Sequence, residues 1–270
     1  MKKLNQFIIE KFRLSKDNLI RKYNYHPKTR DELKDLIDDL IKERGNEADL
    51  NDIDTSVITD MSFLFMNSKF TGNISEWDVS NVKDMQFMFA YSEFNEDISN
   101  WDVNKVEHMQ CMFKNSVFNE DISKWDVSKV ENMRGMFKDS VFNGDISNWD
   151  VSNVKDMQSM FSHSEFNGDI SKWDVSNVKD MPWMFKNSVF NGDISNWNVS
   201  NVEDMSWVFQ GSKFNGDISL WDVSNVKSMR SMFRDSEFNG DISNWDVSNV
   251  KHVDYIFNNC PLEDNPPAWY

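Results

Sequence analysis

The sequence contains little cysteine, proline or glycine and no long apolar run. Its 270 residues include 2 cysteines, 5 prolines and 9 glycines. Two cysteines are too few for a disulfide framework. No stretch approaches the roughly 18 consecutive apolar residues of a membrane-spanning helix, so we expect no transmembrane segment.

Positive charge is scarce as well. The chain has 29 Lys and Arg against 45 Asp and Glu, a net charge of −16. Residues 1–45 are net +4, which leaves −20 on the remainder. This acidity argues against binding nucleic-acid phosphates or an anionic membrane by bulk electrostatics. The basic start of the chain resembles a signal peptide, but Glu10, Lys11 and Arg13 interrupt its apolar run, so we expect a cytoplasmic protein.

Regularity is what the sequence has in abundance. A tryptophan recurs every 24 residues without insertion or deletion, at Trp77, Trp101, Trp125, Trp149, Trp173, Trp197, Trp221, Trp245 and Trp269. A fixed period of roughly 20–50 residues is typical of repeats that stack on one another to bury their apolar faces. Cys111 and Cys260 would then lie about six coils and roughly 30 Å apart, beyond the reach of a disulfide bond.

The repeat at residues 142–165 shows the pattern within one coil. Between Ile146 and Val151, apolar and polar residues are arranged as in a short strand, and apolar residues at 154, 157, 160 and 161 follow at helical spacing. We therefore predict an α/β repeat solenoid. Matching strands of neighbouring coils would form a parallel β-sheet on one face, with short helices or 3₁₀ turns on the other.

Both ends carry signals for caps. Thr29 and Glu32 have capping-box spacing before an amphipathic run that stops at Gly45, and a shorter helix is predicted near residues 2–12. At the other end Pro266 replaces the strand isoleucine, and Trp269 can cover the last coil. We divide the chain into a helical N-terminal extension and cap (1–49), one degenerate and eight full repeats (50–261) and a C-terminal cap (262–270).

Two columns of aspartate run through the repeats, from Asp97 to Asp241 and, directly after the tryptophans, from Asp78 to Asp246. They could hold a ladder of Ca²⁺ ions, which would need several oxygens per ion. Alternatively, each carboxylate accepts backbone N–H groups in its own turn. Asn73 and Asn198 stand in aspartate places, which favours the turns, so we expect no cofactor and no metal.

Signatures of an enzyme are not recognisable. The four histidines, at 26, 108, 163 and 252, have no metal-type pairing. Neither a glycine-rich phosphate loop nor a Ser-His-Asp arrangement is evident. We therefore expect no catalytic activity.

The pattern Ile146-x-x-Trp149-x-Val151, followed by Val-x-x-Met-x-x-Met-Phe from residue 154, resembles the BspA-type leucine-rich repeat surface proteins of bacteria. It is most similar to their mycoplasma-type variant with Asp-Ile-Ser-x-Trp-Asp-Val-Ser-Asn-Val repeats, over about residues 50–269. The resemblance implies a leucine-rich-repeat-like, right-handed solenoid and a cell-surface role in adhesion or protein binding. Similar arrays in viruses and phages make a mobile-element origin an alternative.

Positions that vary among the repeats are candidates for a partner surface. The column two residues after the core methionine reads Phe87, Cys111, Gly135, Ser159, Trp183, Trp207, Ser231 and Tyr255. On a helix this offset is about 200°, so these side chains should face outward, with Trp183 beside Trp207. Exposed aromatics in a row are typical of interface anchors, or else of packing ridges over adjacent turns. The column before each tryptophan is polar except for Leu220.

These observations predict a non-enzymatic protein–protein interaction module. Its candidate contact residues are Phe87, Trp183, Trp207, Tyr255 and Leu220. The expected partner is a protein, not nucleic acid or a membrane, and the oligomeric state stays open. Two alternatives are an adhesin exported by a route not visible in the sequence and an acidic decoy or inhibitor that mimics nucleic-acid charge.

Overall fold

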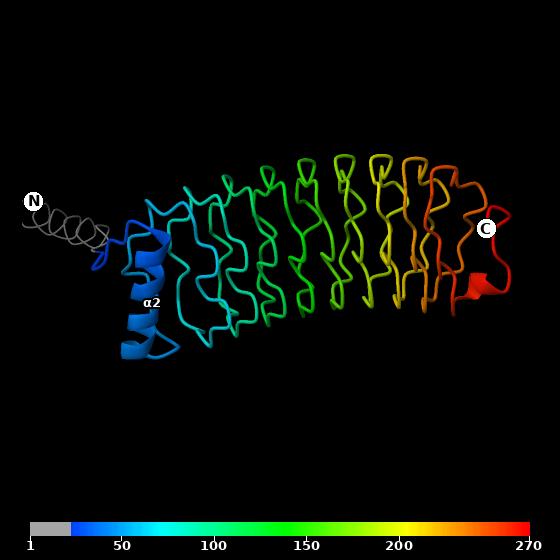
Figure 1. Ribbon diagram of the computed structural model, residues 1–270. Coiled ribbons are helices and arrows are strands. Elements are labelled where there is room, and N and C mark those ends of the chain that lie inside the picture. Colours follow the sequence, from blue (N-terminus) through cyan, green and yellow to red (C-terminus); the bar gives the residue numbers. More distant parts are fainter. Residues whose placement is uncertain (1–22) are drawn as a thin grey trace, which may run out of the picture.

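The computed structural model describes residues 23–270, which wind into coils stacked side by side along one long axis (Figure 1). In this range the helices are α2 (Arg30–Arg44) and the 3₁₀ turn η1 (Pro261–Glu263), one at each end of the stack. The Thr29 side chain accepts the Glu32 N–H, as its spacing predicts. The shorter helix predicted near residues 2–12 lies outside the described residues.

The predicted parallel β-sheet is wrong. Within residues 23–270, neighbouring coils share isolated parallel bridges, such as Asp156 with Asp180, and no longer strand is formed. From Asp60 onward these bridges lie just before each core methionine, where helices or 3₁₀ turns were predicted. The α/β, leucine-rich-repeat-like solenoid with one sheet face and one helical face is therefore not the fold of this chain.

Local hydrogen bonds explain why the Ile-x-x-Trp segment forms no strand. The Trp125 N–H donates to the Ile122 carbonyl of its own coil at 3.2 Å, and the Trp149 indole of the next coil donates to the same oxygen at 3.1 Å. The Asp121 carboxylate accepts the Ser123 N–H at 2.9 Å. These backbone groups are therefore already paired and are not available for a ladder between coils.

The segment after each core methionine is neither helix nor strand, because two of its residues are left-handed. In one coil these are Ser159, with φ +58°, and His163, with φ +57°. Alternate N–H groups donate to the next coil at 2.9 Å, from Met157 to Asp180, Ser159 to Pro182 and Phe161 to Met184. The intervening N–H groups close turns within the coil, such as Met160 to Met157 at 3.1 Å. A ladder of alternate peptide groups thus joins the coils.

Stacked aromatic rings fill the coils. Phe161 lies 4.4 Å from Phe166 and 5.8 Å from Phe185 of the next coil, measured between ring centroids. Each tryptophan of the 24-residue column from Trp77 to Trp245 is 4% exposed. Every indole of this column, Trp269 included, donates to a carbonyl 27 residues earlier, at 2.8–3.2 Å. The predicted burial of the Trp, Phe, Ile, Val and Met columns is confirmed for the full repeats up to Trp245.

The two ends of the peptide ladder are capped by opposite charges. The N–H groups of the ladder point toward the C-terminal end, so within residues 23–270 the carbonyls of the first coil and the N–H groups of the last coil have no further coil to pair with. Arg30 of α2 donates its Nε–H to the Ser62 carbonyl at 3.0 Å. Glu263 of η1 accepts the Asn259 N–H at 2.7 Å. The arrangement resembles the capping of helix termini by charged side chains.

Candidate interaction face

Five of the aromatic residues that are not fully buried belong to one column, two residues after the core methionine. This Met+2 column comprises Phe63, Phe87, Cys111, Gly135, Ser159, Trp183, Trp207, Ser231 and Tyr255. All its members are left-handed, with φ between +52° and +62°. That region is sterically costly for L-residues, and bulky side chains are rarely found in it. The backbone by itself therefore does not favour the aromatics that occupy five of these nine places.

A second left-handed column shows what this backbone conformation alone selects. It lies four residues further along each coil, with φ between +51° and +64°, and comprises Asn67, Tyr91, Asn115, Asp139, His163, Asn187, Gly211, Asp235 and Asn259. Apart from Tyr91, these are residue types that enter the left-handed region easily. The Met+2 column departs from this preference. Strained backbone of this kind is typically retained where function requires it.

The aromatics of the Met+2 column form two stacked pairs. The rings of Trp183 and Trp207 are 4.9 Å apart at 10°, and those of Phe63 and Phe87 are 5.1 Å apart at 6°. The predicted contact of Trp183 with Trp207 is confirmed, but the predicted helix that would present it is wrong. Phe63 was missed by the sequence reasoning because its coil is degenerate. Its position two residues after Met61 was the available signal.

The other two candidates lie apart from these pairs. Tyr255 is 62% exposed and lines a hollow at the C-terminal end, together with Glu263 and Tyr270. Leu220 is 85% exposed and belongs to the column before the tryptophans. The structure therefore places Phe87, Trp183, Trp207 and Tyr255 in one column and leaves Leu220 outside it.

Between the two aromatic pairs the surface is hollowed. The Met+2 column carries the small residues Cys111, Gly135 and Ser159 there. A hollow of about 420 Å³ extends from Phe87, and a second of about 290 Å³ reaches Trp183. The two share Arg134, Lys138 and Ser159, and we term them together the basic groove. Its cations are Lys114, Arg134, Lys138 and Lys186.

Two titratable groups in the basic groove, Cys111 and Asp156, have shifted pKa values. Burial raises the pKa of the Cys111 thiol, although Lys114 and Arg134 oppose this effect. The thiol is therefore kept protonated and is a poor nucleophile. Cys111 and Cys260 are both free. Burial also raises the pKa of Asp156, whose Oδ1 accepts the Gln158 N–H at 2.9 Å.

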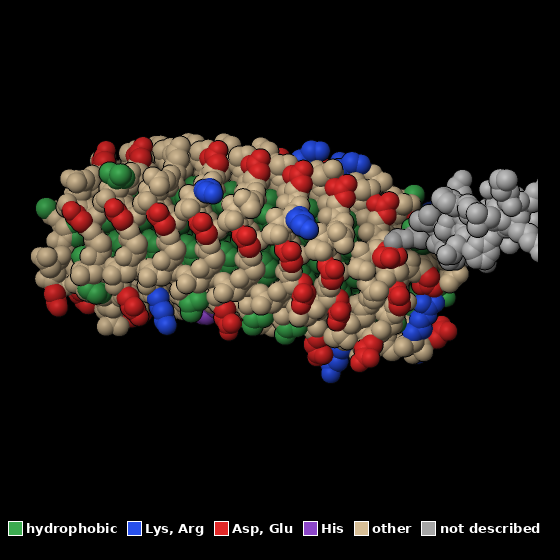
Figure 2. Space-filling view, turned by 180° about the vertical axis from the view of Figure 1, so that it is seen from behind, with side chains coloured by type: hydrophobic (Ala, Val, Ile, Leu, Met, Phe, Trp, Pro, Cys, Tyr) green, Lys and Arg blue, Asp and Glu red, His purple; other side chains and the backbone are tan. Residues whose placement is uncertain are grey.

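The aspartate columns have the geometry of turns. Each carboxylate from Asp97 to Asp241 and from Asp78 to Asp246 accepts the backbone N–H two residues further on. Asn198 accepts the Ser200 N–H in the same way, at 3.2 Å. Acidic side chains form rows along one face (Figure 2). Across residues 23–270, no group of three or more His, Cys, Asp or Glu could hold a metal ion.

These turns predict a loss of stability in acid. Hydrogen bonds from the backbone N–H and side chain of the following serine lower the pKa of Asp145, Asp169, Asp193, Asp217 and Asp241. The folded state therefore binds fewer protons than the unfolded state, whose aspartates titrate near pH 4. The stabilisation is complete above that pH and is lost as the pH falls through the lower folded values.

We expect the melting temperature to fall below about pH 4. Asp→Asn replacement at Asp145, Asp193 and Asp241 keeps the acceptor oxygen and should flatten this dependence. Thermal unfolding of both proteins between about pH 2.5 and pH 7 measures it. A wild-type melting temperature that stays constant down to pH 3 would contradict the assignment.

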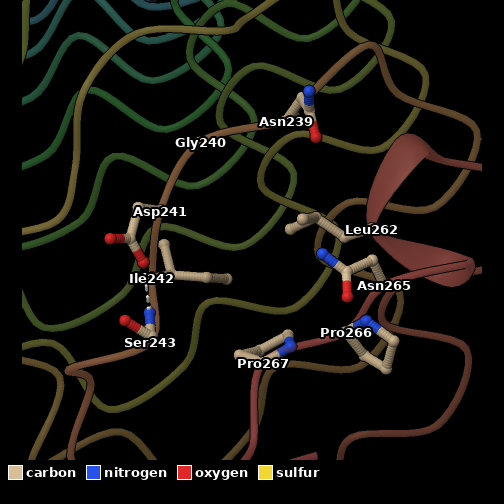
Figure 3. Close-up of a pocket in the computed structure, with 9 residues that line it drawn as sticks. All are labelled: Asn239, Gly240, Asp241, Ile242, Ser243, Leu262, Asn265, Pro266 and Pro267. Atoms are coloured by element: carbon tan, nitrogen blue, oxygen red, sulfur yellow. Dashed lines mark hydrogen bonds between the residues drawn. The ribbon is translucent and has the colours of Figure 1, made fainter.

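A further hollow, of about 390 Å³, marks the place where the repeats stop (Figure 3). Pro266 and Pro267 face the segment from Asp241 to Ser243 there. Proline has no N–H to donate, so the next coil is not continued. The only charged residue in the lining, Asp241, already accepts the Ser243 N–H at 3.0 Å. This hollow therefore forms where the stack of coils ends, and the one charged side chain in its lining is already hydrogen-bonded.

The fold and its surface define a repeat protein whose stacked coils are joined by peptide and side-chain ladders and present one variable column. The model of the family described as "Mycoplasma protein of unknown function, DUF285" matches residues 34–140, 114–211 and 183–269, and the chain belongs to this family. No curated protein and no solved structure matches the chain. In the part of the chain that the structure describes, no helix is long and apolar enough to span a membrane.

Proposed function

We propose that this chain is a non-enzymatic interaction module that binds a protein partner through the Met+2 column. The observation that carries this proposal is the presence of bulky aromatics at left-handed positions, whereas the neighbouring left-handed column has Asn, Asp or Gly at seven of its nine places. A left-handed backbone costs an ordinary residue about 1–2 kcal/mol. Flat, partly exposed aromatic rings are typical anchors of protein interfaces.

The repeats themselves argue against a purely structural role for these rings. Gly135, Ser159 and Ser231 occupy the same column with the same backbone conformation, in coils that stack as well as the others. Aromatic pairs stabilise by only about 0.5–1.5 kcal/mol beyond area burial, which is no more than the left-handed cost. The coil therefore folds without an aromatic at this position.

Replacing Trp183 and Trp207 together by serine should strongly weaken partner binding and leave the fold intact. Serine is the residue that the chain itself uses at 159 and 231, so the backbone conformation is preserved. We expect the affinity for the partner to fall at least about 100-fold, since anchor residues contribute roughly 2 kcal/mol or more each. Proteins retained by the immobilised chain from an extract of the source organism would be identified, purified and titrated against both forms.

A matched control replaces the exposed Val141 and Val189 by serine, which removes apolar surface from a different column. This variant should bind the partner as the unaltered chain does. Equal affinity of the Trp183→Ser/Trp207→Ser variant would refute the proposal. A marked loss of thermal stability in that variant would instead show that the two rings belong to the packing.

Two other functions predict a different dependence on salt. The resemblance to BspA-type surface proteins supports an adhesin, which would use the same aromatic contact. An acidic decoy would use the rows of carboxylates (Figure 2). Decoy binding should collapse between low and moderate ionic strength, because exposed charges are screened within about 10 Å at 0.1 M salt. Contact through the tryptophans should persist.

A further inference from the structure

The basic groove concentrates positive charge on a protein whose net charge is −16. Four cations line it, and Asp156 is the one carboxylate in the lining. Elsewhere in the stack, lysines pair with glutamates of the neighbouring coil, as Lys155 does with Glu131 at 2.7 Å. None of the four groove cations forms an ion pair with a carboxylate of the described residues 23–270. Their charge is therefore available to a ligand.

The cations converge on the small residues of the Met+2 column. The charges of Lys114, Arg134 and Lys138 are all close enough to the Cys111 thiol to lower its pKa, against the larger effect of burial. The Cys111 sulfur would lie 3.0 Å from a Cβ at Gly135, so it extends over this glycine. The Lys114 ammonium also lies 5.2 Å from the ring centroid of Tyr91, a residue outside the two hollows.

The carboxylates near the groove do not cancel this charge. Asp156 directs Oδ1 to the Gln158 N–H. Beyond the larger effect of the Tyr91 side chain, the charge of Asp139 raises the pKa of Lys114, but Asp139 lies outside the two hollows, in the second left-handed column. The hollowed surface thus presents four positive groups against one acidic group whose Oδ1 is already hydrogen-bonded.

The length of the groove suits a short extended peptide. It runs from Phe87 to Trp183, which are four coils apart. Neighbouring rings of the Met+2 column itself are 4.9 Å apart between Trp183 and Trp207 and 5.1 Å apart between Phe63 and Phe87. Four such steps span about 20 Å, which is roughly the distance between the first and last residues of an extended heptapeptide. An aromatic ring stands at each end.

We propose that the basic groove binds an extended acidic segment of the partner protein, with apolar side chains of the segment on Phe87 and Trp183. This inference rests on the proposed function and adds the chemistry of the partner. Carboxylates of the segment lie along Lys114, Arg134, Lys138 and Lys186. The small residues at 111, 135 and 159 leave room for its backbone.

A labelled heptapeptide of five glutamates between two leucines tests the proposal by fluorescence polarisation against the full chain at low salt. Replacing Arg134 and Lys138 together by glutamine should weaken binding about tenfold, because two charge-assisted contacts to the peptide are lost. Ser159→Trp, which fills the groove while keeping its charges, should have the same effect. The chain already accepts tryptophan at this column position.

The matched control replaces Lys124 and Lys172 by glutamine. These exposed lysines lie beside the aspartate column, near Asp121 and Asp169, so the variant loses the same net charge away from the groove. Its affinity for the heptapeptide should be unchanged. An equal loss in the control, or none in the Arg134→Gln/Lys138→Gln variant, would overturn the proposal. Inorganic phosphate that displaces the peptide fully when added at the same concentration of negative charge would overturn it as well, because the groove would then select small anions.

The two proposals fail in different ways. If the identified partner still binds the Arg134→Gln/Lys138→Gln variant but not the Trp183→Ser/Trp207→Ser variant, the interaction module stands and the acidic segment is wrong. If the partner binds the tryptophan variant with full affinity, the Met+2 column is not the interface. In that case the heptapeptide titration still decides whether the basic groove binds an acidic segment.

Discussion

Replacing Trp149 by alanine is expected to lower the free energy of unfolding by about 3–5 kcal/mol. The indole is 4% exposed and packs 6.2 Å from Phe137. Its Nε1–H donates to the Ile122 carbonyl at 3.1 Å, across the joint between two coils. Alanine would leave a cavity and an acceptor without this donor. Urea unfolding followed by circular dichroism measures the loss.

Two further substitutions separate packing from hydrogen bonding at this joint. Trp149→Phe keeps most of the ring contact but removes the donor, and we expect a smaller loss of about 1–3 kcal/mol. Leu220→Ala, at a residue that is 85% exposed, should change stability by less than about 0.5 kcal/mol. A Trp149→Ala protein that unfolds like the Leu220→Ala protein would contradict the assignment of the tryptophan column to the core.

Gly72→Ala is expected to destabilise the N-terminal end of the stack by about 3 kcal/mol or more. A Cβ at this glycine would lie 2.1 Å from the Ala48 carbonyl oxygen and 2.8 Å from the Ala48 nitrogen. These are backbone atoms of the segment that joins α2 to the first coil, so they cannot rotate away as a side chain would. The substitution should therefore push α2 off the first coil. Hydrogen exchange of the amides of α2 would report this opening at single residues.

Gly168→Ala provides the matched control, because Gly168 occupies the same repeat position as Gly72. Its Cβ would lie 2.9 Å from the Phe166 ring and 3.6 Å from the Gly144 carbonyl oxygen. A ring can tilt, and Glu96 and Glu120 already place side chains at this repeat position. We expect a change of less than about 1 kcal/mol. A larger loss for Gly168→Ala than for Gly72→Ala would mean that the close approach at Ala48 is not the limiting contact.

The sequence predicted which residues are buried because burial follows directly from the repeat. A residue that recurs every 24 positions meets its own copies in the neighbouring coils, so the Trp, Phe and Met columns had to be either core or surface throughout. Their apolar character decided for the core. The helix after Thr29 and the turns of the aspartates could also be predicted, because caps and turns depend on residues that are close in the sequence.

The secondary structure of the coil was predicted wrongly, and the reason is physical. Apolar spacing around Ile146 and Trp149 fits a strand, and spacing around Met157 and Phe161 fits a helix. Spacing does not reveal where hydrogen bonds go. The Ile146 carbonyl accepts the Trp149 N–H within the coil and the Trp173 indole N–H from the next coil, which leaves no strand to form.

Only part of the candidate site could be predicted from the sequence. The outward aromatics followed from variation among otherwise identical repeats. Their left-handed backbone could not be foreseen, because tryptophan and phenylalanine are not residues that indicate it. The basic groove could not be predicted from the sequence. Arg134 and Lys186 lie in different coils, and whether their side chains line the same hollow depends on how the turns of each coil orient them.

The sequence by itself determined the period, the buried columns and the turns of the aspartates, because these depend on near neighbours or on exact repetition. Only the tertiary structure decided that the coils are joined by alternate peptide groups and indole N–H groups in place of a sheet. It also decided that Lys114, Arg134, Lys138 and Lys186 gather along one groove. The physical reason is that a hydrogen bond between coils depends on the direction of each peptide group, and left-handed residues set that direction in ways that residue type alone does not specify.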